Sequence, residues 1–242
     1  KPFQQVVAGS NSSLTGEVPV LVVEEMLAGR PTYTGTYTPL GTGAHQVVVM
    51  QLMPGGLTGS YWDNQWLMGT PTMERVDPEI KFSWGTGSIT PYGRDYVSIR
   101  WEGKLLAPST ETFTLYLRAD DAARLYLDHV LLIDAWEGVL TSTGTNEHRA
   151  NIRLKNGTFH DLVLEYREQT GTASVQLMWS SYSTAPEIIP AGSLYHSNSI
   201  AGSPYDIDVV PGAASYPFTD ASGEGLRAAD AGVPASFIIQ AK

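Results

Sequence analysis

The chain has 242 residues and no cysteine, and 15 Lys and Arg against 25 Asp and Glu give it a formal net charge of −10. The lack of cysteine excludes disulfides, thiolate metal sites and cysteine nucleophiles. The negative charge argues against a protein that binds nucleic acid phosphates, which needs a basic face. No run of about 18 apolar residues offers a membrane-spanning helix, and a hydrophobic fraction of 42% suffices for a sizeable core.

Short runs of alternating apolar and polar residues recur between the 24 glycines and 15 prolines of the chain. Within residues 112–117, for example, Phe113, Leu115 and Leu117 would share one face of a strand. No long stretch has the spacing of an amphipathic helix, so the sequence predicts an all-β fold with sandwich or barrel architecture. Strands are predicted in residues 47–52, 96–101, 112–117, 124–127, 162–166 and 173–179, and a strand is favoured within 17–29. Asn156-Gly157 is typical of a hairpin turn.

The motifs of common enzymes are absent from the sequence. Its five histidines lack the His-x-x-x-His spacing of a zinc hydrolase, and there is no Gly-x-Ser-x-Gly elbow. Asp161 and Glu165 would share one face of a strand and come nearest to a glycosidase pair, but solvated charges at a strand edge explain them more simply. We therefore expect no catalytic activity.

Six ordered motifs fill the middle of the chain. They are GLTGSYWDN at 56–64, DPEIKFSW at 77–84, SIRWEG at 98–103, FTLYLRADDAARLYLD at 113–128, LLIDAW at 131–136 and VQLMWS at 175–180. Together they resemble the protective-antigen-type (PA-fourteen) family, first named for the N-terminal domain of anthrax protective antigen. The resemblance implies a β-sandwich over residues 57–196. Many members are carbohydrate-binding modules of adhesins or inserts in glycosidases, so it also implies a lectin-like role.

Asp120 and Asp121 form the one adjacent acidic pair that lies at the end of a predicted strand. Calcium takes about 6–8 oxygen ligands, and carboxylates are among its best donors. Neighbouring side chains on a strand point to opposite faces, so the two carboxylates converge on one ion only if the backbone is distorted. The alternative is that the pair solvates a turn. In the sugar-binding members that the chain resembles, two consecutive aspartates joined by a cis peptide hold a calcium ion.

The resemblance also implies that a later loop completes the calcium site with a polar side chain and backbone carbonyls. Glu168 falls at the position of that side chain, and Gln169 is the alternative ligand. With Glu168 the site would carry three negative charges before the ion binds. Ala122 stands where relatives usually have glycine, and it would be strained if the backbone there has a positive φ.

A sugar bound to such an ion needs an aromatic face and a few hydrogen-bond partners beside it. Trp136 follows a predicted strand and precedes a polar loop, so it is the aromatic candidate for the sugar site, with core packing as the alternative. We expect the other tryptophans, which are Trp62, Trp66, Trp84, Trp101 and Trp179, to lie in the core. The sequons at Asn11 and Asn156 are candidate glycosylation sites.

The flanking segments resemble filamin-type immunoglobulin-like repeats. GTYTP at 35–39 and GAHQVVV at 43–49 are similar to late strands of such a repeat, and SIAGSPYDIDV at 199–209 is similar to its closing strand. We therefore expect late strands of one repeat in 1–56, an inserted protective-antigen-type domain in 57–196, the closing strand in 197–218 and the first strand of a further repeat in 219–242. Since the chain opens in mid-pattern at Lys1, we expect it to be a piece of a longer protein.

The sequence thus favours a noncatalytic, calcium-dependent carbohydrate-binding module. It would serve adhesion or assembly in a large multi-repeat protein of the cell surface or matrix. Its expected partners are glycans, with copies of itself or other filament subunits as further candidates. The alternative is a structural spacer and protein contact domain in an extracellular filament, without sugar binding.

Overall fold

The structure is a computed structural model that describes residues 4–10, 21–27, 30–36, 42–137, 147–210, 219–228, 230–236 and 238–241. It divides into two compact units, one of residues 51–198 and one of residues 4–50 and 199–242. The described elements are strands apart from two short 3-10 helices, η1 (Ala191–Ser193) and η2 (Glu224–Leu226). This confirms the predicted all-β sandwich. None of the helices found among the described residues is long and apolar enough to cross a membrane.

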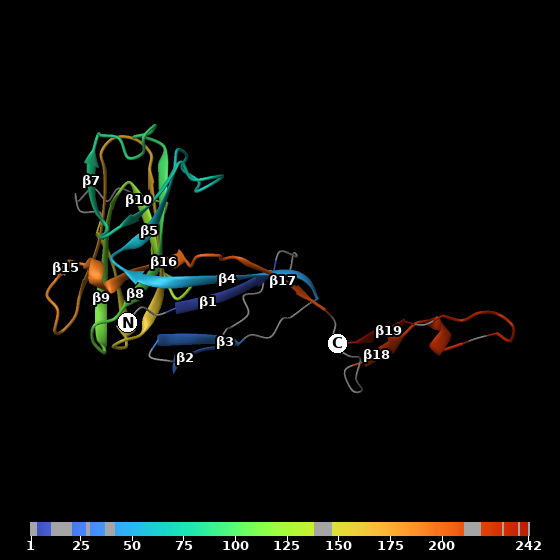
Figure 1. The fold of residues 1–242 in the computed structure, drawn as a ribbon. Coiled ribbons are helices and arrows are strands. Elements are labelled where there is room, and N and C mark those ends of the chain that lie inside the picture. The colour runs from blue at the N-terminus through green and yellow to red at the C-terminus, as the bar shows by residue number, and fades with distance from the viewer. Residues whose placement is uncertain are drawn as a thin grey trace. The chain divides into compact units, whose positions relative to one another are not determined.

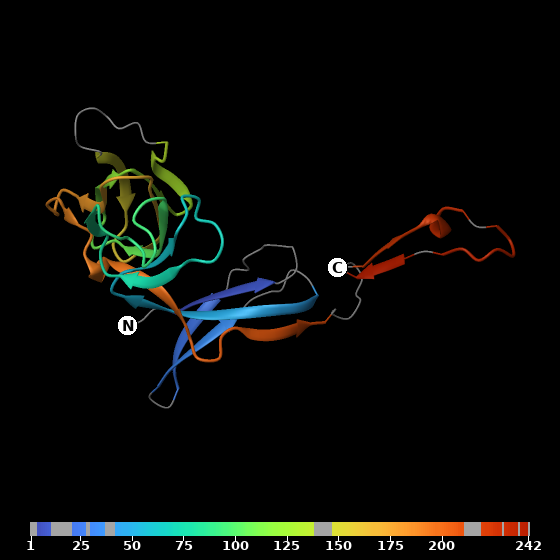
Figure 2. The same cartoon turned by 90° about the horizontal axis from the view of Figure 1, so that it is seen from above.

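Residues 51–198 form two antiparallel sheets that face each other in a sandwich (Figures 1 and 2). The first has the order β6 (Met73–Asp77), β5 (Leu57–Trp62), β8 (Val97–Leu106), β13 (Phe159–Glu168), β10 (Ala122–Leu127) and β11 (Val130–Ala135), and β16 (Leu194–Ser199) also pairs with β8. The second has the order β12 (Glu147–Leu154), β9 (Glu111–Asp120), β14 (Ala173–Ser180) and β15 (Glu187–Ile188), and β7 (Lys81–Gly85) also pairs with β14.

The core lies between the two sheets because alternate residues of each strand point inward. In β9 the side chains of Phe113, Leu115 and Leu117 are fully buried, as the sequence predicted. Aromatic rings fill one end of this core: Trp101 stacks on Phe82, and Trp84 stacks on Tyr166. Such ring pairs add to the stabilisation that the buried area itself provides.

Five of the six predicted strands lie within longer strands of the structure, and the sixth, predicted at 96–101, starts one residue later because β8 begins at Val97. β2 (Leu21–Leu27) confirms the strand favoured within 17–29. Two expectations were wrong. Asn156-Gly157 joins β12 to β13, which belong to different sheets, so the turn crosses between sheets and does not close a hairpin. Trp66 is 67% exposed because it lies in the connection after β5, whereas Trp62, Trp101 and Trp179 are buried and Trp84 packs against the core.

In the second unit, the segments before and after residues 51–198 pair with each other. β4 (Gly43–Pro54) is antiparallel to β17 (Tyr205–Val209), with Val47 opposite Tyr205. The other strands are β1 (Gln4–Ser10), β2, its partner β3 (Arg30–Thr36), and the hairpin of β18 (Thr219–Ser222) and β19 (Ile238–Ala241). The likeness to filamin-type repeats, and the domain boundaries that follow from it, stay predictions. Asn11 lies outside the described residues.

The antiparallel order gathers several connections of the sandwich at one end, which we call the loop end (Figure 1), and four of them are described in full. They are residues 63–72 between β5 and β6, 86–96 between β7 and β8, Asp121 between β9 and β10, and 169–172 between β13 and β14. The chain enters and leaves the sandwich at the opposite end, where Gly55 N and Gly56 N both donate to Leu194 O, at 2.9 and 3.1 Å.

Asp77 is a carboxylate buried in the interior of the sandwich, with 3% of its surface exposed. Its Oδ2 accepts hydrogen bonds from Tyr61 Oη at 2.5 Å and Trp101 Nε1 at 2.7 Å, and its Oδ1 accepts from Arg75 Nε at 2.7 Å. Burial and the neighbouring carboxylate raise the pKa of Tyr61, so its phenol stays a donor. Three strands are thereby joined through one side chain.

Removing this carboxylate should destabilise the sandwich. We expect Asp77→Ala to lower the free energy of unfolding by about 3 kcal/mol, because two buried donors and a guanidinium lose their acceptor. Glu79→Ala, two residues further on and exposed, should change it by less than about 0.5 kcal/mol. Urea denaturation measures both, and equal stability of the two variants would contradict this role for Asp77.

Candidate cation site at the loop end

Four carboxyl groups gather at the loop end of the sandwich. Asp120 ends β9, Asp121 follows it, Glu168 ends β13, and Asp95 lies in the connection before β8. The peptide bond between Asp120 and Asp121 is cis. The negative charges of the other three carboxylates each raise the pKa of Glu168. The structure therefore brings the carboxyl groups of Asp120, Asp121 and Glu168 to the same end of the sandwich and adds Asp95.

The loop of residues 169–172 donates hydrogen bonds to three of these groups. Thr172 Oγ1 donates to Asp120 Oδ2 at 2.7 Å, and Gln169 N donates to Asp121 Oδ2 at 2.6 Å. Gly171 N donates to Asp95 Oδ1 at 3.3 Å. These donors offset part of the repulsion between the carboxylates and fix the direction in which each one points.

Glu168 lies on the inward face of β13 and is fully buried. Its Oε2 is 2.9 Å from Tyr166 Oη, which is also 2.5 Å from Asp120 O. A phenol has one hydrogen and cannot donate to both oxygens. If Tyr166 donates to Asp120 O, a protonated Glu168 would in turn donate its hydrogen to Tyr166 Oη. Burial, followed by the charges of Asp121, Asp120 and Asp95, raises the pKa of Glu168 to about 7, against the lowering effect of the Tyr166 hydrogen bond.

The oxygen chemistry of the site suits a hard cation such as calcium. Oδ1 of Asp120 and Oδ1 of Asp121 have no hydrogen-bond donor among the described residues, and the buried Oε1 of Glu168 has no partner. In the described part of the chain no three acidic or histidine side chains converge as metal ligands. Calcium would therefore also draw on carbonyl, hydroxyl or water oxygens. Glu168 and Gln169 as ligands stay predictions.

Ala122 is buried directly after the acidic pair and does not have a positive φ. The strain that the sequence raised for an alanine at this position is therefore absent. Ala122 pairs with Arg167 in the ladder between β10 and β13, so the acidic pair lies beside the end of β13.

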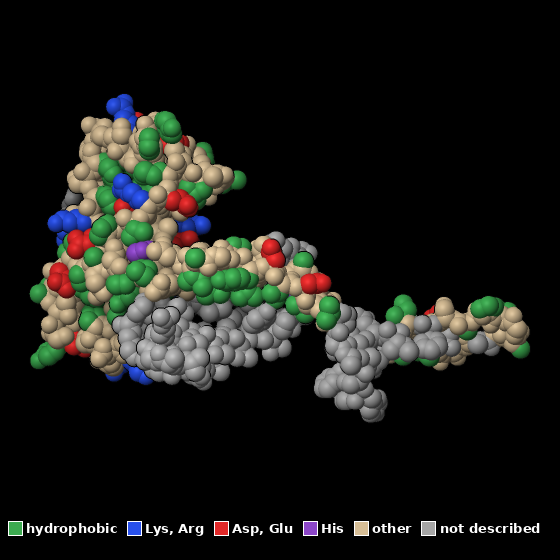
Figure 3. All heavy atoms as spheres, in the orientation of Figure 1, with side chains coloured by type: hydrophobic (Ala, Val, Ile, Leu, Met, Phe, Trp, Pro, Cys, Tyr) green, Lys and Arg blue, Asp and Glu red, His purple; other side chains and the backbone are tan. Residues whose placement is uncertain are grey.

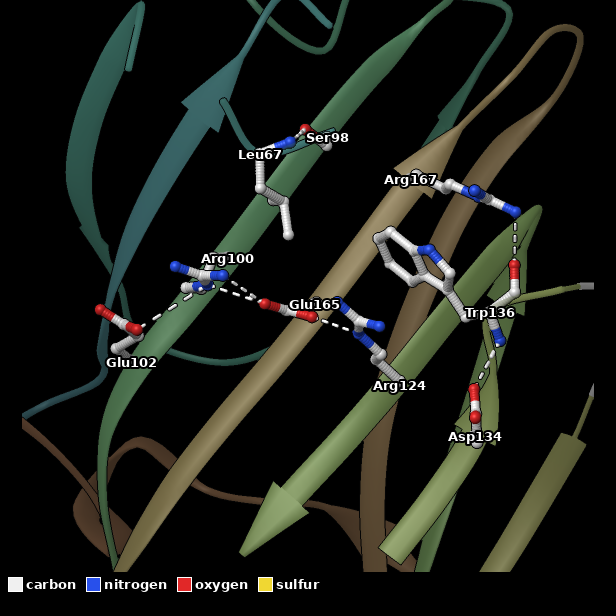
Figure 4. A network of polar contacts seen from close by, with 9 residues as sticks. All are labelled: Leu67, Ser98, Arg100, Glu102, Arg124, Asp134, Trp136, Glu165 and Arg167. Atoms are coloured by element: carbon white, nitrogen blue, oxygen red, sulfur yellow. Dashed lines mark hydrogen bonds and ion pairs between the residues drawn. The ribbon is translucent and has the colours of Figure 1, made fainter. Parts of the chain in front are cut away.

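Trp136 is half-buried and is not part of the hydrophobic core. Its indole lies between the guanidinium groups of Arg124 and Arg167, which are 4.4 and 4.8 Å from the ring centroid (Figure 4). Arg167 Nη2 also donates to Trp136 O at 2.5 Å. The ring is thus held by cation–π contacts. Its role in sugar binding stays a prediction.

Glu165, the residue paired with Asp161 in the glycosidase alternative, lies in the same network (Figure 4). Its side chain is 4% exposed, and both oxygens are bound, one by Arg100 Nη2 at 2.5 Å and the other by Arg124 Nε. Asp161 forms an ion pair with Lys104. Both acids are engaged by cations, but the expectation of solvated charges at a strand edge was wrong for Glu165, which is buried in β13, an inner strand between β8 and β10.

Sequence reasoning missed Asp95, Tyr166 and Thr172. Each contacts the acidic pair or its loop, but none belongs to a motif of adjacent residues. The missing signal was the register of β8 against β13, which places Val97 opposite Glu168 and so brings Asp95 next to the loop of 169–172.

The raised pKa of Glu168 predicts how the stability of the calcium-free protein depends on pH. An acid whose pKa rises from 4.5 to about 7 on folding binds its proton more tightly in the folded state. Its contribution to stability is therefore greatest below pH 4.5, falls as the pH rises towards 7, and is constant above. Thermal unfolding in chelator should show this decline, and Glu168→Gln should remove it while the exposed control Glu79→Gln keeps it. Parallel pH profiles for both variants would contradict the assignment.

Comparison with known proteins places these features in a family. Anti-sigma-I factor RsgI3 from Acetivibrio thermocellus is 41% identical over 144 residues, which are 59% of this chain and 22% of that protein. The structure of an anti-sigma factor domain-containing protein from Clostridium clariflavum is 36% identical, with a TM-score of 0.54, over 59% of this chain and 47% of that one. A second structure of that description is 41% identical, with a TM-score of 0.54, over 59% of this chain and 48% of that one.

This chain thus spans less than half of each of these relatives. The model of the PA14 domain matches residues 54–193, which is more than half of this chain. That stretch contains all four carboxyl groups of the loop end and every strand of the two sheets from β5 to β15. The chain belongs to the PA14 domain family.

Proposed function

We propose that the PA14 domain of this chain is a noncatalytic carbohydrate-binding module whose binding centre is a calcium ion on Asp120 and Asp121. The observation that carries the proposal is the way in which this pair is held. The two carboxylates belong to adjacent residues at the loop end, are partly exposed, and are each oriented by a donor from residues 169–172. The other oxygen of each carboxylate, Oδ1, has no donor among the described residues and is available to a ligand.

A bound calcium ion would supply a centre on which two neighbouring sugar hydroxyls replace water. The chain's own residues prepare that centre. Thr172 and the backbone of Gln169 orient the carboxylates, and the positive ion offsets the repulsion that the acidic group otherwise suffers. Glu168, just beneath, adds negative potential that favours cation binding when its proton is released.

Binding without catalysis fits the surroundings of the site. A glycosidase needs one protonated and one ionised carboxyl group flanking the bond to be cleaved. Of the acids at the loop end, Glu168 has the raised pKa of a general acid, but it is fully buried beneath the pair and does not face solvent. We therefore assign the acidic group to cation binding.

The proposal places the domain outside the cell or at its surface, where polysaccharides are available. Two contexts remain for the whole protein. Adhesion or matrix assembly follows from the resemblance to sugar-binding family members. The names of the relatives favour a second context, in which the domain senses a glycan as part of a regulatory protein. A structural spacer without sugar binding is the outcome that the following experiment can reveal.

Calorimetric titration with calcium, followed by a glycan array with and without chelator, tests the proposal. The chain should bind calcium, and its glycan signals should disappear in chelator. Asp120→Asn/Asp121→Asn should weaken both by at least tenfold, or about 1.4 kcal/mol, because the uncharged amides are poorer calcium ligands. Asp208→Asn, an exposed change in β17, should bind like the unaltered chain.

Glycan binding that survives chelator or the double substitution would contradict the calcium-centred site. Calcium binding without any glycan signal would instead indicate a structural ion, and the spacer role would then be favoured.

A further inference from the structure

Four large apolar side chains are exposed on two connections of the loop end. Trp66 and Met68 lie in residues 63–72 and are 67% and 69% exposed, and Tyr92 and Tyr96 lie in residues 86–96 and are 84% and 55% exposed. Hydrophobic side chains are visible at this end of the sandwich in Figure 3. We call these three aromatic residues and the methionine beside Trp66 the aromatic rim. They are exposed and do not belong to the hydrophobic core, so core packing does not account for them.

One member of the aromatic rim, Tyr96, lies next to the loop that binds the acidic pair. Tyr96 N donates to Gln169 O at 3.1 Å, and Gln169 N donates to the carboxylate of Asp121 at 2.6 Å. A single residue of the 169–172 loop therefore separates Tyr96 from the proposed calcium ligand. A ligand seated on Asp120 and Asp121 would reach the rim if it were longer than one sugar.

Hydrogen bonds tie the two connections of the rim to each other and to the sheet. The carboxylate of Asp63 accepts from Thr90 Oγ1 and, at 2.8 Å, from Thr72 Oγ1. Ser98 Oγ, in β8, donates to Asn64 O at 2.6 Å and accepts from Leu67 N at 3.1 Å. The aromatic side chains thus project from a backbone that is already held, which lowers the entropic cost of binding to them.

The backbone of Tyr96 supports a role for its side chain. Its φ is 57°, in the left-handed region where glycine is the least costly residue. More than half of the side chain is exposed, so core packing does not account for a tyrosine at this position. A ligand that packs against the ring does account for it.

We propose that the aromatic rim is a second binding surface for the same glycan, so that the domain binds a stretch of a neutral polysaccharide several sugars long. This inference rests on the proposed function. Aromatic rings pack against the C–H faces of sugars in consecutive positions along a chain. The formal net charge of −10 on the chain disfavours a strongly anionic glycan, which is why the ligand is neutral.

The test measures affinity against ligand length. Xylo-, cello- and manno-oligosaccharides of one to six units serve as probes in calcium, with calorimetry on the full chain. At least one series should bind, and its affinity should rise at least tenfold from the shortest to the longest member. Trp66→Ala/Tyr92→Ala should abolish that rise and leave the affinity for the shortest member unchanged.

Tyr182→Ala is the matched control, because Tyr182 is fully exposed and lies after β14, away from the loop end. It should keep the dependence on length, and thermal unfolding should show that all three chains are equally folded. Affinity independent of length, or a double variant that behaves like the control, would overturn the second surface while leaving the calcium site intact. Failure of every probe to bind, at any length, would overturn the second surface, whereas the calcium titration and the glycan array decide the calcium site separately.

Discussion

The pairing of β13 with β8 on one side and β10 on the other positions the candidate site. Glu168 lies opposite Val97, and Arg167 lies opposite Ala122. The end of β13 is therefore flanked by the connection that carries Asp95 and by the acidic pair. A slip of one residue in either register would turn every side chain of the strand to the other face. Glu168 would then leave the interior, and Gln169 N would no longer reach Asp121.

Gathering four carboxyl groups in one place has an electrostatic cost, and the structure offsets it in two ways. Donors from residues 169–172 stabilise the charged forms of the outer carboxylates. The inner one, Glu168, is buried and has a pKa raised to about 7, so that it can stay protonated near neutral pH. A cation would offset the remaining repulsion, in keeping with the proposed calcium site.

Most of the fold was predictable because the alternating pattern of strands such as β9 is local information. The acidic pair was predictable too, since its two members are adjacent and lie within a recognisable motif. Asp95, Tyr166 and Thr172 were not, because their proximity depends on the register between strands far apart in the sequence. The same reason explains Trp66. Its apolar character favours a core position, but its strand ends at Trp62, and only the topology reveals that it belongs to a connection.

The protonation of Glu168 tests the central claim that the loop end is built around a cation. NMR titration of its carboxyl carbon would give the pKa in chelator and in saturating calcium. The account predicts a pKa near 7 in chelator and a marked fall when calcium binds, because a positive ion beside Asp120 and Asp121 favours the charged carboxylate. A pKa that is the same with and without calcium would contradict it.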